Sequence, residues 1–355
     1  MSDKKLSDRQ RELLLLCGGS RTYALSEIAS ILGQQGRPVP SAPTLRRDMA
    51  LLTARRFFKQ VGDRKSTKYE LDLSNQIFAP LDAHEYAQKD IDERVGNSSF
   101  NHELFPNVPK TLFEADQLSL LQDATKKFQD AAQGASSTIQ RRELERFVIE
   151  LAWKSSKIEG NTYSLLDTEL LIKEGIEATG RSREEAVMIL NHKRAFEFIL
   201  EERSEFVDLK ISSIKDIHRL LVENLQISFG LRNRIIGITG SLYKPLQVPT
   251  QIQEACESLL SAIVRQQDPY SKALLALAGI GYIQPFEDGN KRTSRLTANA
   301  ILLADNCAPL SYRSIGELSY REAMLTFYER NSLVTLQKLF VQQYLFACEN
   351  YLKFV

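Results

Sequence analysis

Cysteine and histidine are scarce in this chain of 355 residues, which contains four of each. No two cysteines form a C-x-x-C pair, and no H-E-x-x-H motif or Cys/His cluster is present. A structural zinc site is therefore not expected, because it needs several closely spaced thiolates or imidazoles. Scattered cysteines are typical of a reduced cytoplasmic protein with structural thiols.

Long hydrophobic runs are also missing. No apolar stretch approaches the ~20 residues that a membrane-spanning helix needs. The start of the chain, MSDKKLSDRQ, has no signal-peptide core. With 43% hydrophobic and 26% charged residues, the composition is that of an ordinary globular protein. We therefore expect a cytoplasmic protein of two or three domains with no membrane partner.

The net charge of +1 conceals a segregation of charge along the chain. Residues 1–75 carry 14 Lys and Arg against 8 Asp and Glu, whereas the remainder carries 32 against 37. The first segment is thus basic and the rest is acidic. This pattern favours contact of the first segment with a polyanion, although a solvated basic surface explains the same charge.

Three short helices and two strands are predicted in residues 1–75. Ser7 and Gln10 form a capping box for the first helix, and Ser41 caps the third. The predicted elements are a helix around Leu13, Leu14 and Leu16, a helix over Ser26–Leu32, a helix with Leu45, Met49 and Leu52 on its inner face, and strands at Phe57–Val61 and Lys68–Leu71.

This order of elements predicts a winged helix-turn-helix, whose third helix enters the major groove of DNA. The run TLRRDMALL with the basic tip after it resembles the DeoR-type winged helix of bacterial repressors. A module for dimerisation or protein docking is the alternative. The residues that would contact duplex DNA are Thr44, Arg46 and Arg47 in the third helix and Arg64 and Lys65 in the tip.

The rest of the chain is expected to be mainly α-helical. Residues 76–137 are predicted to be a linker with a connecting helix, and residues 138–355 a second domain. Its one interruption is the segment RIIGITGSLYKPLQVP, Arg234–Pro249, which has β-branched residues around two glycines and ends in prolines. That pattern predicts a β-hairpin with a role in binding.

The run QPFEDGNKRTSR, residues 284–295, predicts a site for nucleotide phosphates and a divalent metal. A helix that starts after a loop offers unpaired N–H groups to an anion, and Gly289 lets the backbone approach it closely. Lys291, Arg292 and Arg295 are unfavourable to the helix dipole in the first turns, so they indicate a bound anion. Asp288 beside them is suited to hold Mg²⁺ that bridges two phosphates.

Eleven of these twelve positions are compatible with the signature of Fic-domain proteins, H-P-F-x-[DE]-G-N-[GK]-R-x-x-R, which the run therefore resembles. The segment Arg234–Pro249 resembles the flap of such proteins, and SSKIEG, residues 155–160, resembles their inhibitory motif [ST]-x-x-x-E-[GN]. Together these resemblances span residues ~145–345. They imply a helical Fic core with a β-hairpin flap, which transfers AMP from ATP and Mg²⁺ to a Ser, Thr or Tyr hydroxyl of a protein.

The resemblance also implies individual roles. Glu159 would pair with Arg295 and displace the γ-phosphate of ATP, and its spacing of four from Ser155 puts both on one helical face. Within the loop, the resemblance implies a core anchor at Phe286, a metal ligand at Asp288 and an anion hole formed by Gly289, Asn290 and Lys291. Arg292 would bind the β-phosphate and Arg295 the γ-phosphate, while Ser155 and Gly160 would complete the inhibitory motif. The flap residues that would dock the target are Ile236, Gly237, Ile238 and Thr239.

Gln284 departs from the family pattern, which has histidine as general base at this position. A glutamine amide can orient a hydroxyl but cannot accept its proton near neutral pH. Three explanations fit: a natural nucleotide-binding protein with slow or no catalysis, a substitution made in the laboratory, or a natural enzyme that uses another base. His218 precedes the flap by under twenty residues and is taken as a structural helix residue.

Two functions of different kinds follow from the sequence. The first is a protein adenylyltransferase restrained by Glu159, with a hydrolase that removes AMP as a close variant. The second is a DNA-binding regulator whose Fic domain senses a nucleotide. Intact Glu159 favours the enzyme, whereas Gln284 favours the regulator. A homodimer is compatible with the resemblance.

Overall fold

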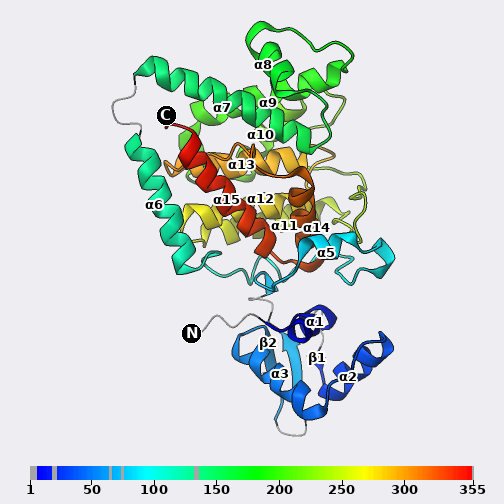
Figure 1. Cartoon of the computed structure of the whole chain (residues 1–355). Coiled ribbons are helices and arrows are strands. Elements are labelled where there is room, and N and C mark those ends of the chain that lie inside the picture. Colours follow the sequence, from blue (N-terminus) through cyan, green and yellow to red (C-terminus); the bar gives the residue numbers. More distant parts are fainter. Residues whose placement is uncertain (1–5, 18–21, 64–65, 73–75, 132–135, 354–355) are drawn as a thin grey trace. The chain divides into compact units, whose positions relative to one another are not determined.

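The computed structural model describes residues 6–17, 22–63, 66–72, 76–131 and 136–353 (Figure 1). The chain divides into two compact units. The first comprises Met1–Pro109, Ile238–Lys244 and Leu325–Thr335, and the second comprises the remaining residues. Helices dominate the described residues, which confirms the mainly α fold predicted from the sequence.

The elements of the first unit begin with a small α/β segment. Its helices and strands are α1 (Asp8–Leu16), β1 (Thr22–Tyr23), α2 (Leu25–Gln34), α3 (Ala42–Ala54), β2 (Phe58–Val61), β3 (Lys68–Leu71), α5 (Ala83–Gln88) and the 3-10 turn η2 (Ile91–Glu93). The strands form one antiparallel sheet in the order β1-β3-β2. Three helices and two strands were predicted, but β1 was not, since two residues show no periodicity.

Helix caps form where the sequence placed them. The Ser7 hydroxyl accepts a hydrogen bond from the Gln10 amide at 3.3 Å, and the Gln10 side chain accepts one from the Ser7 amide at 3.0 Å. The Ser41 hydroxyl accepts from the Thr44 amide at 3.4 Å and so starts α3. These bonds satisfy backbone donors that the first turn of a helix leaves unpaired.

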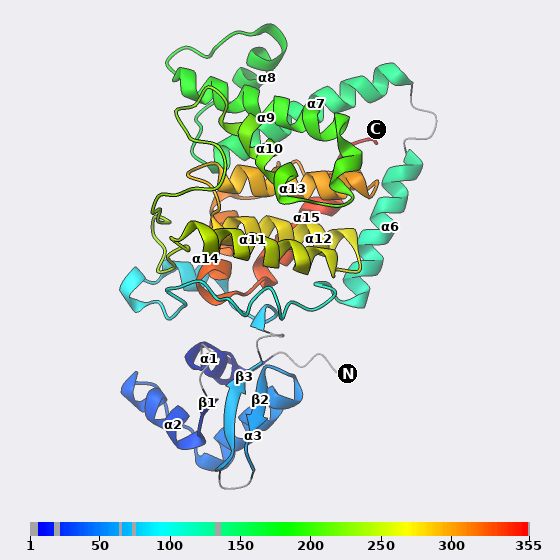
Figure 2. The same cartoon turned by 180° about the vertical axis from the view of Figure 1, so that it is seen from behind.

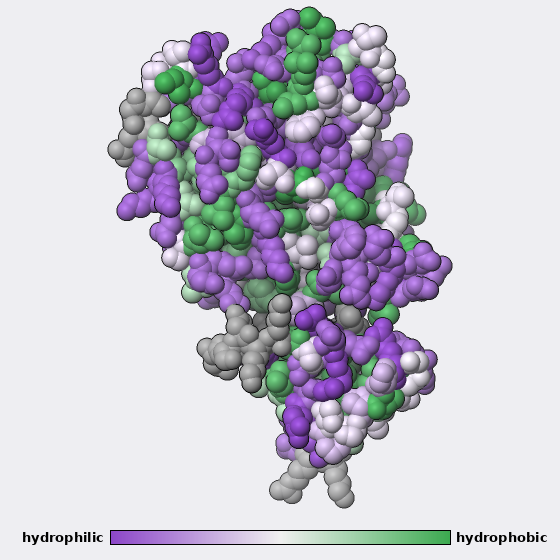
Figure 3. All heavy atoms as spheres, in the orientation of Figure 1, coloured by the Kyte–Doolittle hydropathy of each residue, from purple (hydrophilic) through white to green (hydrophobic). Residues whose placement is uncertain are grey.

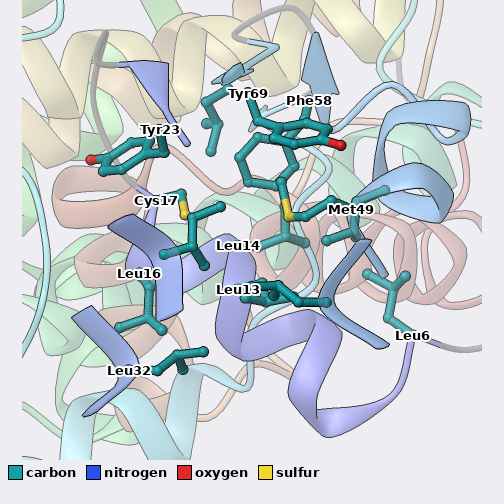
Figure 4. Close-up of a cluster of buried hydrophobic side chains, with 14 residues drawn as sticks. Leu6, Leu13, Leu14, Leu16, Cys17, Tyr23, Leu32, Met49, Phe58 and Tyr69 are labelled. Carbon is teal, nitrogen blue, oxygen red and sulfur yellow. The ribbon is translucent and has the colours of Figure 1, made fainter. Parts of the chain in front are cut away.

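The apolar faces of α1, α2 and α3 pack against the sheet to form the core of this segment. Leu13, Leu32, Met49 and Phe58 come from four different elements, and each is at most 1% exposed. Figure 4 shows Leu13, Leu14, Met49 and Phe58 close together, with the sulfur of Met49 beside Phe58, and Leu32 near Leu16. The spacing of leucine and methionine along each helix therefore predicted the buried face correctly.

Asp48 is an exception to the predicted pattern on α3. Its neighbours in sequence, Arg46 and Arg47, are exposed as expected, whereas Asp48 was also placed on an outer face and is in fact buried. Its carboxylate accepts hydrogen bonds from Arg9 Nε at 2.5 Å and from Gln10 Nε2 at 2.9 Å. The charge is satisfied by Arg9, which lies 39 residues away in sequence, so helical spacing alone does not reveal this partner.

Replacing Asp48 by asparagine is expected to lower the free energy of unfolding by about 1–3 kcal/mol, because a buried, charged acceptor is lost. Burial acts to raise the pKa of Asp48, but Arg9 and Gln10 outweigh it and hold the pKa below its usual value. A depressed carboxyl pKa contributes stability above about pH 4 that is lost as the pH falls through the folded value.

Urea unfolding at pH 7 and in acid measures this contribution. The matched control is Asp63→Asn, because Asp63 is an exposed aspartate of the same unit. The difference between Asp48→Asn and the parent should shrink in acid. An Asp48→Asn protein as stable as the parent at pH 7 contradicts the structural role.

The β-hairpin predicted for the flap segment, residues 234–249, is wrong. These residues all lie in the described part of the chain and contain no strand. Backbone groups that would pair across a hairpin bind elsewhere in the first unit. The Leu242 amide donates to the buried Glu329 carboxylate at 2.8 Å, and the Lys244 amide donates to the Ser98 carbonyl at 3.0 Å. These partners are distant in sequence, so the local β-branched pattern was misleading.

The second unit is a bundle of helices. They are α6 (Ala115–Ala131), α7 (Ser137–Ile158), α8 (Leu165–Glu174), α9 (Arg183–Glu201), the 3-10 turn η3 (Arg203–Phe206), α10 (Ile211–Val222), α11 (Pro249–Val264), α12 (Pro269–Ile283), α13 (Asn290–Ala304), α14 (Glu317–Arg330) and α15 (Val334–Asn350). The last six residues of α14 and the first two of α15 belong to the first unit.

Two adjacent helices, α12 and α13, form the centre of this bundle. They lie side by side in both Figure 1 and Figure 2, and α7, α9 and α10 pack against α13. Almost every residue of α12 is buried, which fits its mainly apolar sequence. Gly279 allows α11 to approach, since a Cβ at this position would lie 2.4 Å from Leu259 Cδ1. This packing fixes the loop that joins α12 to α13.

Hydrophilic residues predominate on the face shown in Figure 3, with smaller hydrophobic areas between them. Within the described ranges, no helix is both long and apolar enough to cross a bilayer.

Candidate functional site

The loop between α12 and α13 is shaped by two residues in left-handed backbone conformation. Gln284 ends α12 with φ +52°, and Gly289 precedes α13 with φ +77°. Asn290 closes the loop, because its side chain accepts from the Phe286 amide at 2.8 Å and donates to the Phe286 carbonyl at 2.9 Å. Phe286 itself is 1% exposed and so anchors the loop in the core.

The first turn of α13 is open toward an anion. Its N-cap is Gly289, which has no side chain to cap the backbone N–H groups, and the helix has fifteen residues and a full dipole. The φ of +77° at Gly289 is a conformation that residues with a Cβ rarely adopt, whereas an added Cβ would make only ordinary contacts with Val222 at 3.4 Å and His218 at 3.6 Å. The loop therefore offers donors at a helix N-terminus, which is the geometry that binds phosphate groups.

Arg292 is the cation most clearly available to a ligand. Its side chain is 3% exposed, yet Nη1 makes no hydrogen bond within the described chain. Its Nη2 lies 3.5 Å from Asp288 Oδ2. Burial lowers the pKa of Arg292, against the opposing effects of Asp288 and Glu159. A buried N–H without a partner costs free energy, so an incoming anion would relieve a real deficit.

Arg295 is held by Ser155 and Glu159. Its Nη1 donates to Glu159 Oε1 at 2.8 Å, Nε donates to the Ser155 hydroxyl at 2.8 Å, and Nη2 donates to the Ser155 carbonyl at 2.9 Å. The guanidinium is fully buried and lies over the ring of Tyr320, 5.5 Å from its centroid. The structure thus brings Ser155 and Glu159 of α7 against Arg295 of α13.

Glu159 caps the C-terminal end of α7, directly before Gly160, whose φ of +100° ends the helix. Burial acts to raise the pKa of Glu159, but Arg295 and Lys291 outweigh it and keep the carboxylate ionised. Lys291 Nζ lies 3.4 Å from Glu159 Oε2, a pairing that the sequence did not predict. Glu159 therefore occupies space between two cations of the loop.

Gln284 is buried at the general-base position of the signature. Its Nε2 donates to the Gly281 carbonyl at 2.6 Å, and its amide N–H donates to the Ile280 carbonyl at 3.0 Å. The Gln284 carbonyl accepts from Arg232 Nε at 2.7 Å. The side chain is thus ordered within the loop, and it contains no group that titrates near neutral pH.

His218 on α10 supports the loop, a role that sequence reasoning missed. Its ring stacks on Phe286 with centroids 3.8 Å apart, and Nε2 donates to the Asp288 carbonyl at 3.0 Å. Burial lowers the pKa of His218 to about 4, and Arg292 adds to this effect, so the ring is neutral near pH 7. Its place on a helix was predicted, but nothing in the sequence linked it to the loop.

Arg232 is a second residue that the sequence did not single out. It is 3% exposed and donates to the carbonyls of Gln284, Arg234 and Leu246, while its own amide donates to the Pro285 carbonyl at 2.9 Å. It therefore joins the end of α12 to both arms of the flap segment. In the sequence, only the position of Arg232 between Gly230 and the flap segment indicates this bridging role, and the indication is weak.

The remaining predicted residues fall in different places. Ile236 and Gly237 belong to the second unit, whereas Ile238 and Thr239 belong to the first. In the first unit, Thr44 on α3 is half-buried, and the two arginines that follow Leu45 are exposed. The two tip residues predicted to contact DNA, Arg64 and Lys65, lie outside the described residues.

Residues 208–302 match the model of the Fic/DOC family. This region includes α10, α11, α12, the loop that follows it and all of α13 except its last two residues. The chain is 27% identical over 213 residues to the protein adenylyltransferase Fic of Drosophila willistoni, covering 59% of this chain and 42% of that protein. It is 26% identical over 179 residues to protein adenylyltransferase fic-1 of Caenorhabditis elegans, covering 49% and 35%.

Solved structures show the same fold around the Fic/DOC domain. A fragment of Fic-1 from C. elegans superposes with a TM-score of 0.56 at 21% identity, covering 67% of this chain and 72% of that one. A Fic domain containing signaling protein from Bacteroides thetaiotaomicron superposes with a TM-score of 0.54 at 20% identity, covering 65% and 94%. The chain spans less than half the length of the curated relatives that it matches.

Proposed function

We propose that this chain is a protein adenylyltransferase, which transfers AMP from ATP and Mg²⁺ to a hydroxyl group of a protein under restraint by Glu159. The Fic/DOC domain and the relatives named protein adenylyltransferase support this assignment. The single observation that carries it is the buried guanidinium of Arg292, with an unpaired N–H beside the open first turn of α13. An anion with several oxygens fits both features.

In this proposal, different residues of the loop bind different phosphate groups of ATP. The backbone of Gly289, Asn290 and Lys291 receives the α- and β-phosphates, and Arg292 binds the β-phosphate through its free Nη1. Asp288 has a carboxylate that is 67% exposed and lies 3.5 Å from Arg292 Nη2, so its oxygens are accessible and suit a hard cation. Mg²⁺ usually takes one or two carboxylates and fills its other positions with phosphate oxygens and water.

Glu159 acts as an inhibitor by occupying Arg295. A γ-phosphate needs the same guanidinium that Glu159 now engages at 2.8 Å. The pair is anchored on the other side by Ser155, so Arg295 cannot turn toward a ligand without breaking several bonds. ATP then binds without its γ-phosphate in the productive position, and transfer is suppressed.

Gln284 limits the chemical step. In the transfer, the target hydroxyl oxygen attacks the α-phosphorus, pyrophosphate leaves, and the hydroxyl proton needs an acceptor. Glutamine can accept a hydrogen bond from the hydroxyl but does not take up the proton. We infer that nucleotide binding is intact and that transfer is slow, because general-base help is worth about 10²–10⁴-fold.

Incubation with α-labelled ATP, Mg²⁺ and a cell lysate tests the proposal. Four proteins are compared: this sequence, Gln284→His, Glu159→Gly and the double variant. Label on lysate proteins should be strongest with the double variant. If the double variant binds ATP but transfers no label, the chain is not an adenylyltransferase.

A second candidate function is regulation through DNA, and the first unit favours it. Arg46 and Arg47 are exposed on α3 of a basic segment whose elements follow the order of a winged helix-turn-helix. In this alternative the Fic/DOC domain senses nucleotide, and Gln284 is consistent with weak catalysis. The two functions are compatible with each other, because DNA binding could direct the enzyme to a location.

Duplex DNA binding by the full chain is expected to fall about 40–150-fold between 50 and 200 mM salt, as for three or four phosphate contacts. Joint replacement of Arg46 and Arg47 by alanine should reduce the salt slope by about two. The matched control replaces Lys126 and Lys127, another adjacent and exposed pair of cations, on α6. Fluorescence anisotropy measures the DNA affinity and its salt dependence for the parent and for both double variants. No affinity at low salt, or the same slope in both variants, contradicts DNA binding through α3.

A further inference from the structure

Glu159 is held by two cations, one at each carboxylate oxygen. Oε1 accepts from Arg295 Nη1 at 2.8 Å, and Oε2 lies 3.4 Å from Lys291 Nζ. Both cations come from α13, four residues apart and so on one face of the helix. The carboxylate is 19% exposed, so each contact is only partly screened by water.

The two cations differ in how firmly they are held. Arg295 is fully buried, bonded twice to Ser155 and flanked by Tyr312 and Tyr320. Lys291 is 34% exposed, and within the described residues its ammonium contacts Glu159 alone. Its four-carbon stem is flexible, whereas the guanidinium of Arg295 is fixed. Of the two cations that hold Glu159, Lys291 is therefore the one whose side chain can move.

We propose that Lys291 is a positioning residue that holds Glu159 in its inhibitory place against Arg295. This inference rests on the proposed role of Glu159 as an inhibitor. Arg295 alone leaves Oε2 of Glu159 without a charged partner and leaves the carboxylate free to rotate about its Cγ–Cδ bond. Lys291 binds the second oxygen, so both oxygens must lose a partner before the carboxylate can leave.

The same lysine lies in the first turn of α13, where phosphates would bind. An arriving triphosphate competes with Glu159 for the Lys291 ammonium, since both are anionic oxygen ligands. When Lys291 moves to the phosphates, Glu159 retains only Arg295 and leaves more readily. Lys291 thereby couples occupation of the loop to release of the inhibitor.

A double-mutant cycle tests this coupling. Lys291→Gln is made in two Gln284→His proteins, one with Glu159 and one with Glu159→Gly, and ATP affinity and the rate of label transfer are measured. With Glu159 present, the substitution should raise transfer relative to its effect with Glu159→Gly, where only a phosphate contact is lost. The expected ratio of the two effects is about two- to fivefold, as for a partly exposed ion pair. Lys291→Arg keeps the charge and should restore the ratio to one.

Each outcome decides the proposal. A ratio above two that Lys291→Arg abolishes supports it, whereas a ratio of one for Lys291→Gln overturns it. ATP affinities measured by calorimetry for the same four proteins provide a second double-mutant cycle that does not depend on catalysis. If no protein in the set transfers label, the proposed transferase function fails, while the cycle in ATP affinity still tests the contact between Lys291 and Glu159.

Discussion

Replacing Gln284 by histidine in the Glu159→Gly protein is expected to raise AMP transfer by about 10²–10⁴-fold, the usual worth of a general base. The position is prepared for it, because Gln284 stands at the end of α12 in a left-handed conformation fixed by Arg232. The existing side chain is buried and bonded to the Gly281 carbonyl, so an imidazole occupies a formed site.

The histidines already present in the second unit do not replace the missing base. His218 donates to the Asp288 carbonyl and stacks on Phe286, so it is committed to the loop. His192 is fully buried, and burial together with Arg295 lowers its pKa well below the usual value. Neither ring is placed to gain and release a proton near neutral pH.

The pH dependence of transfer identifies the introduced histidine as the base. A histidine of ordinary pKa, about 6.5, accepts a proton from the target only when unprotonated. Transfer by the Gln284→His protein should therefore fall as the pH drops below about 6. The control is Gln284→Ala in the same background, which should stay at the low rate of the glutamine protein. Equal rates for histidine and alanine contradict a general base at this position.

Replacing Arg292 by methionine is expected to weaken ATP binding about 10–100-fold, because a buried, charged hydrogen bond to phosphate is lost. The same substitution should leave the melting temperature unchanged or raise it. Without a ligand, Nη1 of Arg292 is buried and unpaired, so removing it removes a cost. Loss of binding without loss of stability is characteristic of a residue kept for function.

Arg313 provides the matched comparison. It pairs with the buried Glu150 at 3.0 Å, so Arg313→Met leaves a buried carboxylate with fewer partners. This control should lower the melting temperature and leave ATP affinity within about twofold. Calorimetry and thermal unfolding of both variants separate the two effects. If Arg292→Met destabilises the protein as Arg313→Met does and ATP affinity is unchanged, Arg292 is structural.

The sequence predicted the parts of this site that depend on local spacing. The roles of the glycine at position 289 and of the separation of Ser155 from Glu159 each follow from backbone geometry within a few residues. These features place the start of α13 and the end of α7. The contact of Glu159 with Arg295 spans 136 residues and came from the family pattern alone.

Features that depend on distant partners were not predicted. His218, Arg232 and Lys291 are ordinary residues in sequence, and their roles arise only when α10, the flap segment and α7 meet the loop. The flap segment failed for the same reason, since Leu242 finds the Glu329 carboxylate instead of an opposing strand. Side-chain partners across long separations decide these positions, and periodicity does not encode them.

Titration of the Glu159→Gly protein with ATP in the presence of Mg²⁺ tests the central claim most directly, because binding of a nucleotide at the α12–α13 loop underlies every other step. We predict saturable binding of one ATP per chain, weakened at least tenfold by Arg292→Met and reduced when Mg²⁺ is withheld. No binding to the Glu159→Gly protein, or binding of the same strength in its Arg292→Met variant, would contradict a phosphate site at this loop.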